Sequence, residues 1–271
     1  MMIDQITRRI IFPLLFAPLA VKGQALPAED EIWQKFVRWA TEISPDEWPA
    51  NLRGILAKYR EKLTKDGIQT VQAEIAIRTI QQRVNGDTAF STLAYNKAYQ
   101  SKNPFFSSSP NDFLVRTVKS LQPGRALDLG MGQGRNTIFL AQQGWDVTGL
   151  DLAEVGITIA KDRAKELGIK INALVQDVDR FDFGSSVWDL VCTLYFSGYN
   201  YVHDIEKRIV KGLKTGGHLI YEVPNASVKG LMDRWTSLEL LGLRPIHLEF
   251  DTGKADWGQQ GFQRILAQKP A

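Results

Sequence analysis

The spacing of hydrophobic positions along the chain changes near residue 125. Between residues 31 and 84 apolar side chains recur at the period of an amphipathic helix. They form three runs: Ile32, Phe36, Trp39, Ala40 and Ile43; Leu52, Ile55, Leu56, Tyr59 and Leu63; and Ile68, Val71, Ile75 and Ile80. Ser44-Pro45-Asp46-Glu47 has the hydroxyl, proline and acids of a helix start. This pattern predicts a small helical bundle over residues 28–85.

From residue 125 onward the pattern alternates between short apolar runs and helical spacing. The predicted strands are 125–129, 146–151, 171–176, 188–194, 217–222, 243–250 and 261–268. The predicted helices are 135–143, 153–167, 203–213 and 227–241. Strands separated by helices pair in parallel, whereas the last two strands have only a loop between them. The sequence therefore predicts an α/β fold: a doubly wound, mostly parallel seven-stranded sheet with an antiparallel C-terminal hairpin.

Residues 86–111 connect the predicted bundle to the main domain at residues 112–271. This segment is rich in Ser, Asn, Pro and aromatic residues, and its periodicity ends after Tyr99. A helix followed by a long irregular stretch is expected, with Ser109-Pro110-Asn111-Asp112 capping a helix that carries Leu114, Val118 and Leu121. Long loops in compact domains are often lids or binding loops. A lid and a plain linker are both compatible with the sequence.

The first 27 residues have a different composition from the rest. Arg8 and Arg9 precede an apolar run over residues 10–21, which small residues follow. This order is typical of a secretory signal peptide. Export, membrane contact through residues 8–25 and packing on the domain all remain open.

Composition and charge exclude several classes of function. Lys and Arg number 33 against 30 Asp and Glu, a net charge of +3, and the basic residues form no run with interleaved aromatics. We therefore expect no nucleic-acid partner. A single cysteine, Cys192, excludes an intrachain disulfide, and with three scattered histidines the sequence suggests no metal site. The oligomeric state is not predicted.

The stretch LDLGMGQG, residues 127–134, is the strongest candidate for chemistry. Gly130, Gly132 and Gly134 follow the first strand of the predicted sheet, where a ligand can approach a main chain that lacks β-carbons. Asp151 ends the second strand, at the place where a carboxylate accepts hydrogen bonds from ribose hydroxyls. These features predict a site for an adenosine-containing ligand.

Two details argue against a dinucleotide. The dinucleotide fingerprint G-x-G-x-x-G would place its third glycine at position 135, which is Arg135. Asp128, in the strand just before the turn, would repel a pyrophosphate but suits a ligand with an ammonium group. Asp177, followed by Val178, ends the third strand, where the two are expected to contact an adenine; the alternative is that Asp177 caps the following turn.

Taken together, these motifs resemble the class I S-adenosylmethionine-dependent methyltransferases. LDLGMGQGRNT is similar to the family's first motif, TGLDLAE to its second-strand acid, QDVDRFDF to its adenine segment and WDLVCTLYF to its fourth strand. The GQGRN variant resembles the tellurite-resistance and thiopurine type. The resemblance covers about residues 90–268 and implies a Rossmann-like fold with S-adenosylmethionine as cofactor and S-adenosylhomocysteine as product. It implies these cofactor-binding residues: Asp128, Gly130, Gly132, Gly134, Asp151, Leu152, Asp177 and Val178.

The methyl acceptor is expected beyond the fourth strand, where Tyr195, Tyr199 and Tyr201 are candidate pocket residues. Tyr195 and Tyr199 are the predicted catalytic residues, although all three tyrosines could instead pack beneath a lid. His203 could act as a base or begin the next helix. We expect a small-molecule acceptor with a soft nucleophile, such as a thiol or chalcogen; O- or N-methylation and a non-catalytic cofactor-binding protein are the alternatives. Because the donor is made and used inside cells, a cytoplasmic location is favoured.

Aromatic side chains of the connecting segment are expected to lie over the cofactor. They are Tyr95, Tyr99, Phe105 and Phe106. Three other residues are expected to be structural: His218 and His247 within strands, and Cys192 as a buried strand residue.

Overall fold

The computed structural model describes residues 28–84, 86–102, 106–196, 204–224, 228–254 and 260–270. The signal-like arm at residues 1–27 and the predicted residues Phe105, Tyr199, Tyr201 and His203 lie outside these ranges. Among the described helices, none has both the length and the apolar character needed to cross a membrane.

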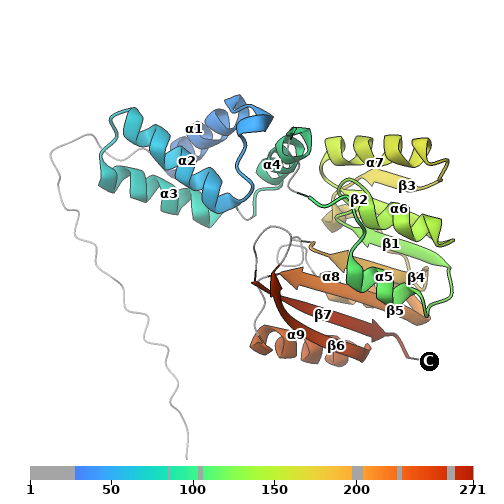
Figure 1. Cartoon of the computed structure of the whole chain (residues 1–271). Helices are drawn as coiled ribbons and strands as arrows, with labels where there is room; N and C mark the ends of the chain where they lie inside the picture. The colour runs from blue at the N-terminus through green and yellow to red at the C-terminus, as the bar shows by residue number, and fades with distance from the viewer. Residues whose placement is uncertain are drawn as a thin grey trace, which may run out of the picture.

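The predicted N-terminal bundle consists of helices α1 (Glu29–Glu42), α2 (Leu52–Lys65) and α3 (Thr70–Val84) (Figure 1). Its core is built around Phe36, whose side chain is fully buried. The Phe36 ring centroid lies 5.1–5.7 Å from those of Trp33, Trp39, Tyr59 and Phe90. Aromatic contacts of this length stabilise a core beyond the apolar area that they bury. The bundle therefore has a hydrophobic core of its own.

The predicted helix start at Ser44-Pro45-Asp46-Glu47 is wrong. Pro45–Glu47 forms only a short 3₁₀ turn, and Ser44 makes no side-chain capping bond. The turn ends at Trp48, which is extended with ψ 124°, because Pro49 follows it and disfavours helical conformation in the preceding residue. Helix α2 begins later and is capped by Asn51, whose side chain accepts a hydrogen bond from Gly54 N at 2.9 Å.

Two helices lie between the bundle and the sheet in sequence. Helix α4 (Thr88–Gln100) is capped by Asp87, and α5 (Asp112–Val118) is capped by Asn111, as predicted. Leu121, predicted to belong to the second of these helices, follows its end. In Figure 1, α4 lies between the bundle and the sheet.

The main domain is built on a seven-stranded sheet in the order β3-β2-β1-β4-β5-β7-β6. The strands are β1 (Arg125–Leu129), β2 (Asp146–Asp151), β3 (Asn172–Val175), β4 (Trp188–Leu194), β5 (Leu213–Pro224), β6 (Arg244–Lys254) and β7 (Gln260–Gln268). The first five strands pair in parallel, and β7 pairs antiparallel with both β5 and β6. His218, His247 and Cys192 lie in β5, β6 and β4 respectively, and the Cys192 side chain is fully buried.

Helices cover both faces of this sheet (Figure 1). On one face α6 (Arg135–Gln142) packs with α5 against β1, β4 and β5, and α7 (Glu154–Glu166) packs against β2 and β3. On the other face, α8 (Ile205–Gly212) and α9 (Val228–Leu240) cover the main hydrophobic core. The predicted fold, an α/β doubly wound sheet with an antiparallel C-terminal hairpin, is confirmed. It brings the turn after β1 to the point where the strand order reverses, which is where such sheets bind ligands.

Replacing Phe36 with Ala should destabilise the bundle strongly. Removing a fully buried ring leaves a cavity, so we expect a loss of about 3–5 kcal/mol in the free energy of unfolding. Val71→Ala in α3 is the control, because Val71 is 64% exposed and its truncation should change stability little. Urea denaturation followed by circular dichroism measures both. A loss below about 1 kcal/mol for Phe36→Ala would show that the bundle core is not packed as described.

Candidate functional site

The turn between β1 and α6 runs through three glycines with left-handed backbone conformation. The φ angles of Gly130, Gly132 and Gly134 are 71°, 53° and 77°. Residues with a β-carbon rarely adopt such angles, so glycine is required by the backbone itself. The turn is tied to β2 by Gly130 N, which donates to the Leu150 carbonyl at 2.9 Å.

Aromatic rings lie where β-carbons on two of these glycines, Gly130 and Gly132, would be. A β-carbon at Gly130 would lie 2.8 Å from Cδ2 of Phe196, and one at Gly132 would lie 2.5 Å from the Tyr99 hydroxyl. A β-carbon at Gly156, at the start of α7, would lie 2.9 Å from Cε2 of the Tyr99 ring. The glycines are thus needed for close approach as well as for φ, and the turn is covered by one ring from α4 and one from the end of β4.

Asp151 lies beneath the turn at the end of β2. Its Oδ2 accepts a hydrogen bond from Gly132 N at 2.8 Å, and its Oδ1 accepts one from Ala153 N at 2.8 Å. Burial raises the pKa of Asp151, against the opposing effect of these backbone donors. Each carboxylate oxygen accepts more than one hydrogen bond, so further donors can be accommodated. The adjacent Leu152 is half-buried at the same edge.

Asp128 is almost fully buried in β1, below the same turn. Its side chain is 1% exposed, and Oδ2 accepts a hydrogen bond from the Thr137 hydroxyl at 2.7 Å. Burial raises the pKa of Asp128 to about 6, although Thr137 and Arg135 act in the opposite direction. A nearby cation would favour the ionised form. This carboxyl group is therefore placed to respond to a positively charged ligand.

Gln133, between the second and third glycines, adds an unsatisfied donor. Its Nε2 is buried and has no hydrogen-bond partner among the described residues. Buried polar atoms in proteins are nearly always paired, so an orphan at a glycine turn indicates a missing ligand or water. With the backbone cradle and the two acids, this donor fits a nucleoside-containing group that carries a charged amino acid portion.

The third strand brings Asp177 and Val178 to the same edge of the sheet. Gln176 N donates to the Asp151 carbonyl at 2.9 Å, which joins the two strand ends. The Asp177 side chain accepts a hydrogen bond from Asp179 N at 2.9 Å and so caps a 3₁₀ turn (Val178–Arg180). The side chain of Val178 is buried in the main core. Capping is thus the role that Asp177 has in this structure, and contact of either residue with adenine stays a prediction.

Tyr195 marks the other side of the turn, directly after β4. Its φ of 60° is unusual for a residue with a bulky side chain. Its ring meets that of Phe262 edge-on at 6.0 Å, and the Arg135 guanidinium lies 5.4 Å from its centroid. Burial, followed by a hydrogen bond and charge repulsion from Glu222, raises the pKa of the Tyr195 phenol. The Tyr195 phenol is therefore placed to donate a hydrogen bond to the Glu222 carboxylate.

Comparison with known proteins agrees with this geometry. Residues 126–217 match a family model described as a methyltransferase domain. Over 127 residues the chain is 28% identical to the probable S-adenosyl-L-methionine-dependent methyltransferase TehB of Haemophilus influenzae, covering 44% of each chain. These matches support a class I S-adenosylmethionine-dependent methyltransferase domain within this chain.

A second relative and a solved structure define the extent of the match. A ubiquinone biosynthesis O-methyltransferase of Pectobacterium atrosepticum is 26% identical over 122 residues, which cover 44% of this chain and 51% of that protein. The crystal structure of TehB from Haemophilus influenzae has a TM-score of 0.51 at 18% identity, covering 67% of this chain and 66% of that one. The chain spans about half the length of the curated relatives that it matches. The similarity thus concerns the methyltransferase domain.

Helix α4 connects the bundle to this methyltransferase domain through three neighbouring side chains. Asn96 Oδ1 accepts a hydrogen bond from Val155 N, in the first turn of α7, at 3.1 Å. Lys97 is buried and donates to the carbonyls of Thr41 and Ile43 at the end of α1, a favourable place for a cation. Tyr99 then reaches the glycine turn, and burial raises the pKa of its phenol. The helix is thus attached on both sides.

The predicted aromatic group of the connecting segment is partly assembled. Tyr99 stacks on Tyr95 at 6.3 Å between centroids and lies 5.1 Å from Phe106, while Phe105 is outside the described residues. Of these rings, Tyr99 contacts the glycine turn itself.

Sequence reasoning missed a buried polar group behind Tyr195. Glu222 in β5 is 1% exposed, and Arg264 in β7 donates to it at 2.5 Å. The signal available was weak: one charged residue inside each of two otherwise apolar strand patterns, which indicates a paired buried charge. Their pairing could not be predicted, because it depends on the antiparallel register of β5 and β7, in which Glu222 lies opposite Arg264.

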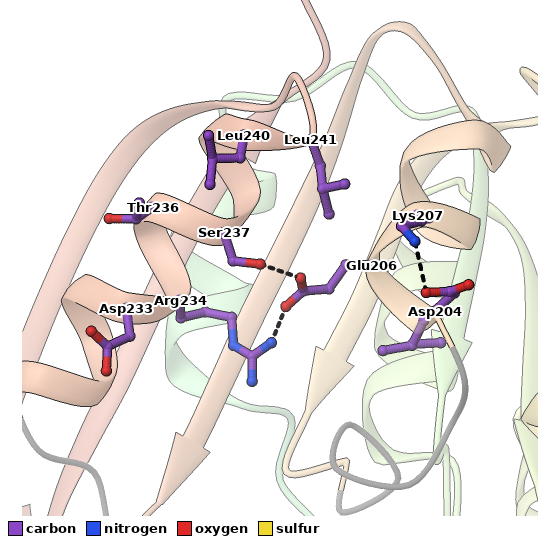
Figure 2. A pocket seen from close by; sticks show the side chains of 10 residues that line it. Asp204, Glu206, Lys207, Asp233, Arg234, Thr236, Ser237, Leu240 and Leu241 are labelled. Atoms are coloured by element: carbon purple, nitrogen blue, oxygen red, sulfur yellow. Dashed lines mark hydrogen bonds and ion pairs between the residues drawn. The ribbon is translucent and has the colours of Figure 1, made fainter. Parts of the chain in front are cut away.

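A groove on the described surface lies away from the glycine turn. It is a groove of about 660 Å³ between α8 and α9, with Glu206 held between Ser237 and Arg234 (Figure 2). The charged groups in this groove pair with one another, and the groove is open enough to leave Leu240 83% exposed. The glycine turn carries an unpaired donor and a backbone cradle instead. We therefore take the turn as the candidate site and interpret the groove as an ion-paired contact between two helices.

Substitution of Gly132 by Ala tests the packing of Tyr99 on the turn. Backbone strain at positive φ should cost about 1–2 kcal/mol, and the clash with the Tyr99 hydroxyl should add to it. Gly67→Ala is the matched control, since Gly67 has φ 80° and open space around its missing β-carbon. Chemical denaturation of both variants, each also made in a Tyr99→Ala background, gives a double-mutant cycle. We expect the excess cost at Gly132 to disappear without Tyr99; an unchanged cost would contradict the contact.

Proposed function

We propose that the protein transfers a methyl group from S-adenosylmethionine to a small-molecule acceptor. The observation that carries this proposal is the left-handed glycine turn, bonded through Gly132 to the Asp151 carboxylate at the point where the strand order reverses. The match of residues 126–217 to a methyltransferase domain supports it. The bound cofactor would supply an electrophilic methyl group on a sulfonium.

Each part of the cofactor has a proposed partner at the turn. The ribose hydroxyls would donate to Asp151, and Leu152 would lie alongside. Asp128 and the turn at Gly130, Gly132 and Gly134 would hold the methionine portion, with Asp128 facing its ammonium. Asp177 and Val178 would contact the adenine. This last part has the weakest support, because one side chain caps a turn and the other is buried in the core.

The methionine carboxylate also needs a partner, and Arg135 is the candidate. Its guanidinium lies near enough to lower the pKa of Asp128, and it forms no ion pair among the described residues. One of its donors bonds the Ser109 carbonyl at 3.3 Å, which leaves others available. A cation beside two carboxyl groups matches the alternating charges of an amino acid zwitterion.

The chain's own contribution to the reaction is positioning. Displacement at a methyl carbon requires the acceptor, the carbon and the sulfur in line, so much of the rate comes from alignment. Tyr99 and Phe196 cover the turn and would exclude water from it. Tyr195 would line the acceptor side together with Tyr199, which lies outside the described residues.

A soft nucleophile such as a thiol or chalcogen is the preferred acceptor. Of the described groups near Tyr195, none is a suitable base: the phenol has a raised pKa, and Glu222 is engaged by Arg264 and Asn111. An acceptor that ionises without help suits such a site. The relatives that act in ubiquinone biosynthesis as O-methyltransferases support methylation of an oxygen as the alternative.

Residues 86–111 are proposed to act as a lid over the cofactor and not as a passive linker. The position of Tyr99 on the turn and the attachment of α4 to α7 through Asn96 support this role. A lid residue covers the bound ligand. Because Tyr99→Ala removes the ring that covers the turn, it should weaken cofactor affinity or turnover. Supply of the donor would place the reaction inside the cell.

Calorimetric titration with S-adenosylmethionine and S-adenosylhomocysteine tests the proposal. We expect binding of both by the wild type and a loss of at least tenfold in affinity for Asp151→Ala, because the ribose would lose a charged acceptor. Asp146→Ala is the control: it lies at the far end of the same strand, exposed. Wild-type protein that binds neither ligand would overturn the proposal.

A methyl-transfer assay with thiol, selenide, phenol and amine acceptors separates the remaining alternatives. Turnover of thiols or selenides supports the preferred acceptor class, and turnover of phenols alone supports O-methylation. Cofactor binding without transfer to any acceptor would favour a non-catalytic binding protein.

Binding should also depend on pH through Asp128. The pKa of this group is about 6 in the folded protein, so below that pH it is protonated and cannot attract an ammonium. S-Adenosylhomocysteine affinity should therefore rise as the pH increases through about 6, with release of a proton on binding. Titration at pH 6 in two buffers of different ionisation enthalpy measures that proton. Equal heats in both buffers would contradict the assignment of Asp128; Asp128→Asn should show weaker binding without the pH dependence.

A further inference from the structure

Glu222 is a buried carboxylate that organises the side of the site opposite the glycine turn. Its Oε1 accepts a hydrogen bond from Asn111 Nδ2 at 2.8 Å, and its Oε2 accepts one from Arg264 Nε at 2.5 Å. It also forms a hydrogen bond with the Tyr195 phenol. A charge buried this deeply is tolerated only when it is paired and hydrogen-bonded. Glu222 therefore accepts hydrogen bonds from three different segments of the chain and fixes them relative to one another.

Arg264 is itself fixed by the strands around it. In addition to Glu222, it contacts Glu249 and donates to Asp251 at 2.8 Å. Burial lowers the pKa of Arg264. Hydrogen bonds to these carboxylates and the attraction of Glu222 outweigh burial, so the pKa is raised overall. The Glu222 side chain therefore has a rigid partner in β7, and its orientation toward Tyr195 is set by the sheet.

Tyr195 is held to Glu222 by its backbone as well as by its phenol. Tyr195 N donates to the Glu222 carbonyl at 2.8 Å, which extends the pairing of β4 with β5 by one residue. The chain then turns out of the sheet at the left-handed φ of 60°. Such strain in a non-glycine residue persists only where the surroundings determine the conformation. Here the hydrogen bonds from the Tyr195 backbone and phenol to Glu222 hold Tyr195 in this conformation.

The turn at Tyr195 decides where the next residue goes. Phe196 follows it, and its Cδ2 lies 2.8 Å from the β-carbon position of Gly130. Relaxation of Tyr195 to an ordinary conformation would redirect the chain and withdraw Phe196 from the glycine turn. The placement of both rings thus depends on the conformation of Tyr195, which is bonded to both the carbonyl and the carboxylate of Glu222.

We propose that Glu222 is a positioning residue of the acceptor side, which through Tyr195 holds Phe196 against the glycine turn. Its effect on methyl transfer rests on the function proposed above, whereas its effect on the two rings does not. Loss of the Glu222 acceptor should therefore disturb the closure of the site over Gly130 and the handling of the acceptor, while cofactor contacts at Asp151 remain.

Two matched double variants isolate the hydrogen bond from the charge. E222Q/R264M and E222M/R264M both remove the buried ion pair and leave no unpaired charge at either position, but only the first keeps a hydrogen-bond acceptor for Tyr195. Tyr195→Phe is a third variant, which removes the phenol donor and leaves Glu222 with Arg264. If either double variant fails to fold, Tyr195→Phe still tests the hydrogen bond between the phenol and Glu222.

The readout is ¹⁹F NMR of 4-fluorophenylalanine placed at position 196, in the protein without ligand. We expect E222Q/R264M to keep the wild-type chemical shift, and E222M/R264M and Tyr195→Phe to move toward the shift of a solvent-exposed ring. An unchanged shift in E222M/R264M and in Tyr195→Phe would overturn the proposal. Because no substrate is present, this result is independent of whether the protein proves to be a methyltransferase.

Kinetics with the thiol or selenide that is methylated best form the second arm. E222M/R264M should lose about 10- to 100-fold in kcat/KM for the acceptor through misplacement, and E222Q/R264M should stay within about threefold of wild type. Affinity for S-adenosylhomocysteine should differ less between the two double variants than kcat/KM for the acceptor does, because the contacts at Asp151 remain in both. Equal kcat/KM in both would contradict a positioning role. Failure of the wild type to bind cofactor would instead overturn the proposed function and leave the NMR result to decide the role of Glu222.

Discussion

The turn after β1 imposes a backbone constraint on which the rest of the site depends. At Gly130, Gly132 and Gly134 the chain adopts left-handed angles, and the absent β-carbons leave room that side chains from distant segments fill. Tyr99 enters from α4 and Phe196 from the end of β4. A β-carbon at Gly130 or Gly132 would displace one of these rings. The same lack of β-carbons exposes backbone amides at the edge of the sheet where the strand order reverses, which explains why the turn suits a nucleoside ligand.

Around this turn, three acidic side chains are held by specific partners and not by exposure to solvent. Asp151 is bonded to Gly132 N, Asp128 to Thr137 and Glu222 to Arg264. Buried acids of this kind hold a site rigidly, because each would be costly to leave unpaired. Rigidity matters for methyl transfer, in which alignment of the reacting atoms supplies much of the rate. Helix α4 extends the arrangement to the N-terminal bundle, since Lys97 fixes it to α1 at one side and Asn96 to α7 at the other.

The sequence predicted the strands, the helices and the glycine turn well, because these follow from local periodicity and from residue types with few conformational choices. The prediction of the start of α2 was wrong. The turn that begins at Pro45 ends before Pro49, and Asn51 caps the helix instead. The sequence named Tyr195 but not its left-handed backbone, and it did not pair Glu222 with Arg264. Those features depend on the register of β4, β5 and β7, which join residues far apart in the chain. Periodicity carries no information on such pairings.

The turn after β1, with Asp151 beneath it, is proposed to bind the methyl donor. A crystal structure of the protein with S-adenosylhomocysteine tests this most directly. The account predicts the ribose hydroxyls on the Asp151 carboxylate, the amino acid portion along Gly130–Gly134 between Asp128 and Arg135, and a Tyr99 ring that has shifted or come to line the ligand. Ligand bound elsewhere, for example in the groove between α8 and α9, with the turn unchanged, would contradict it.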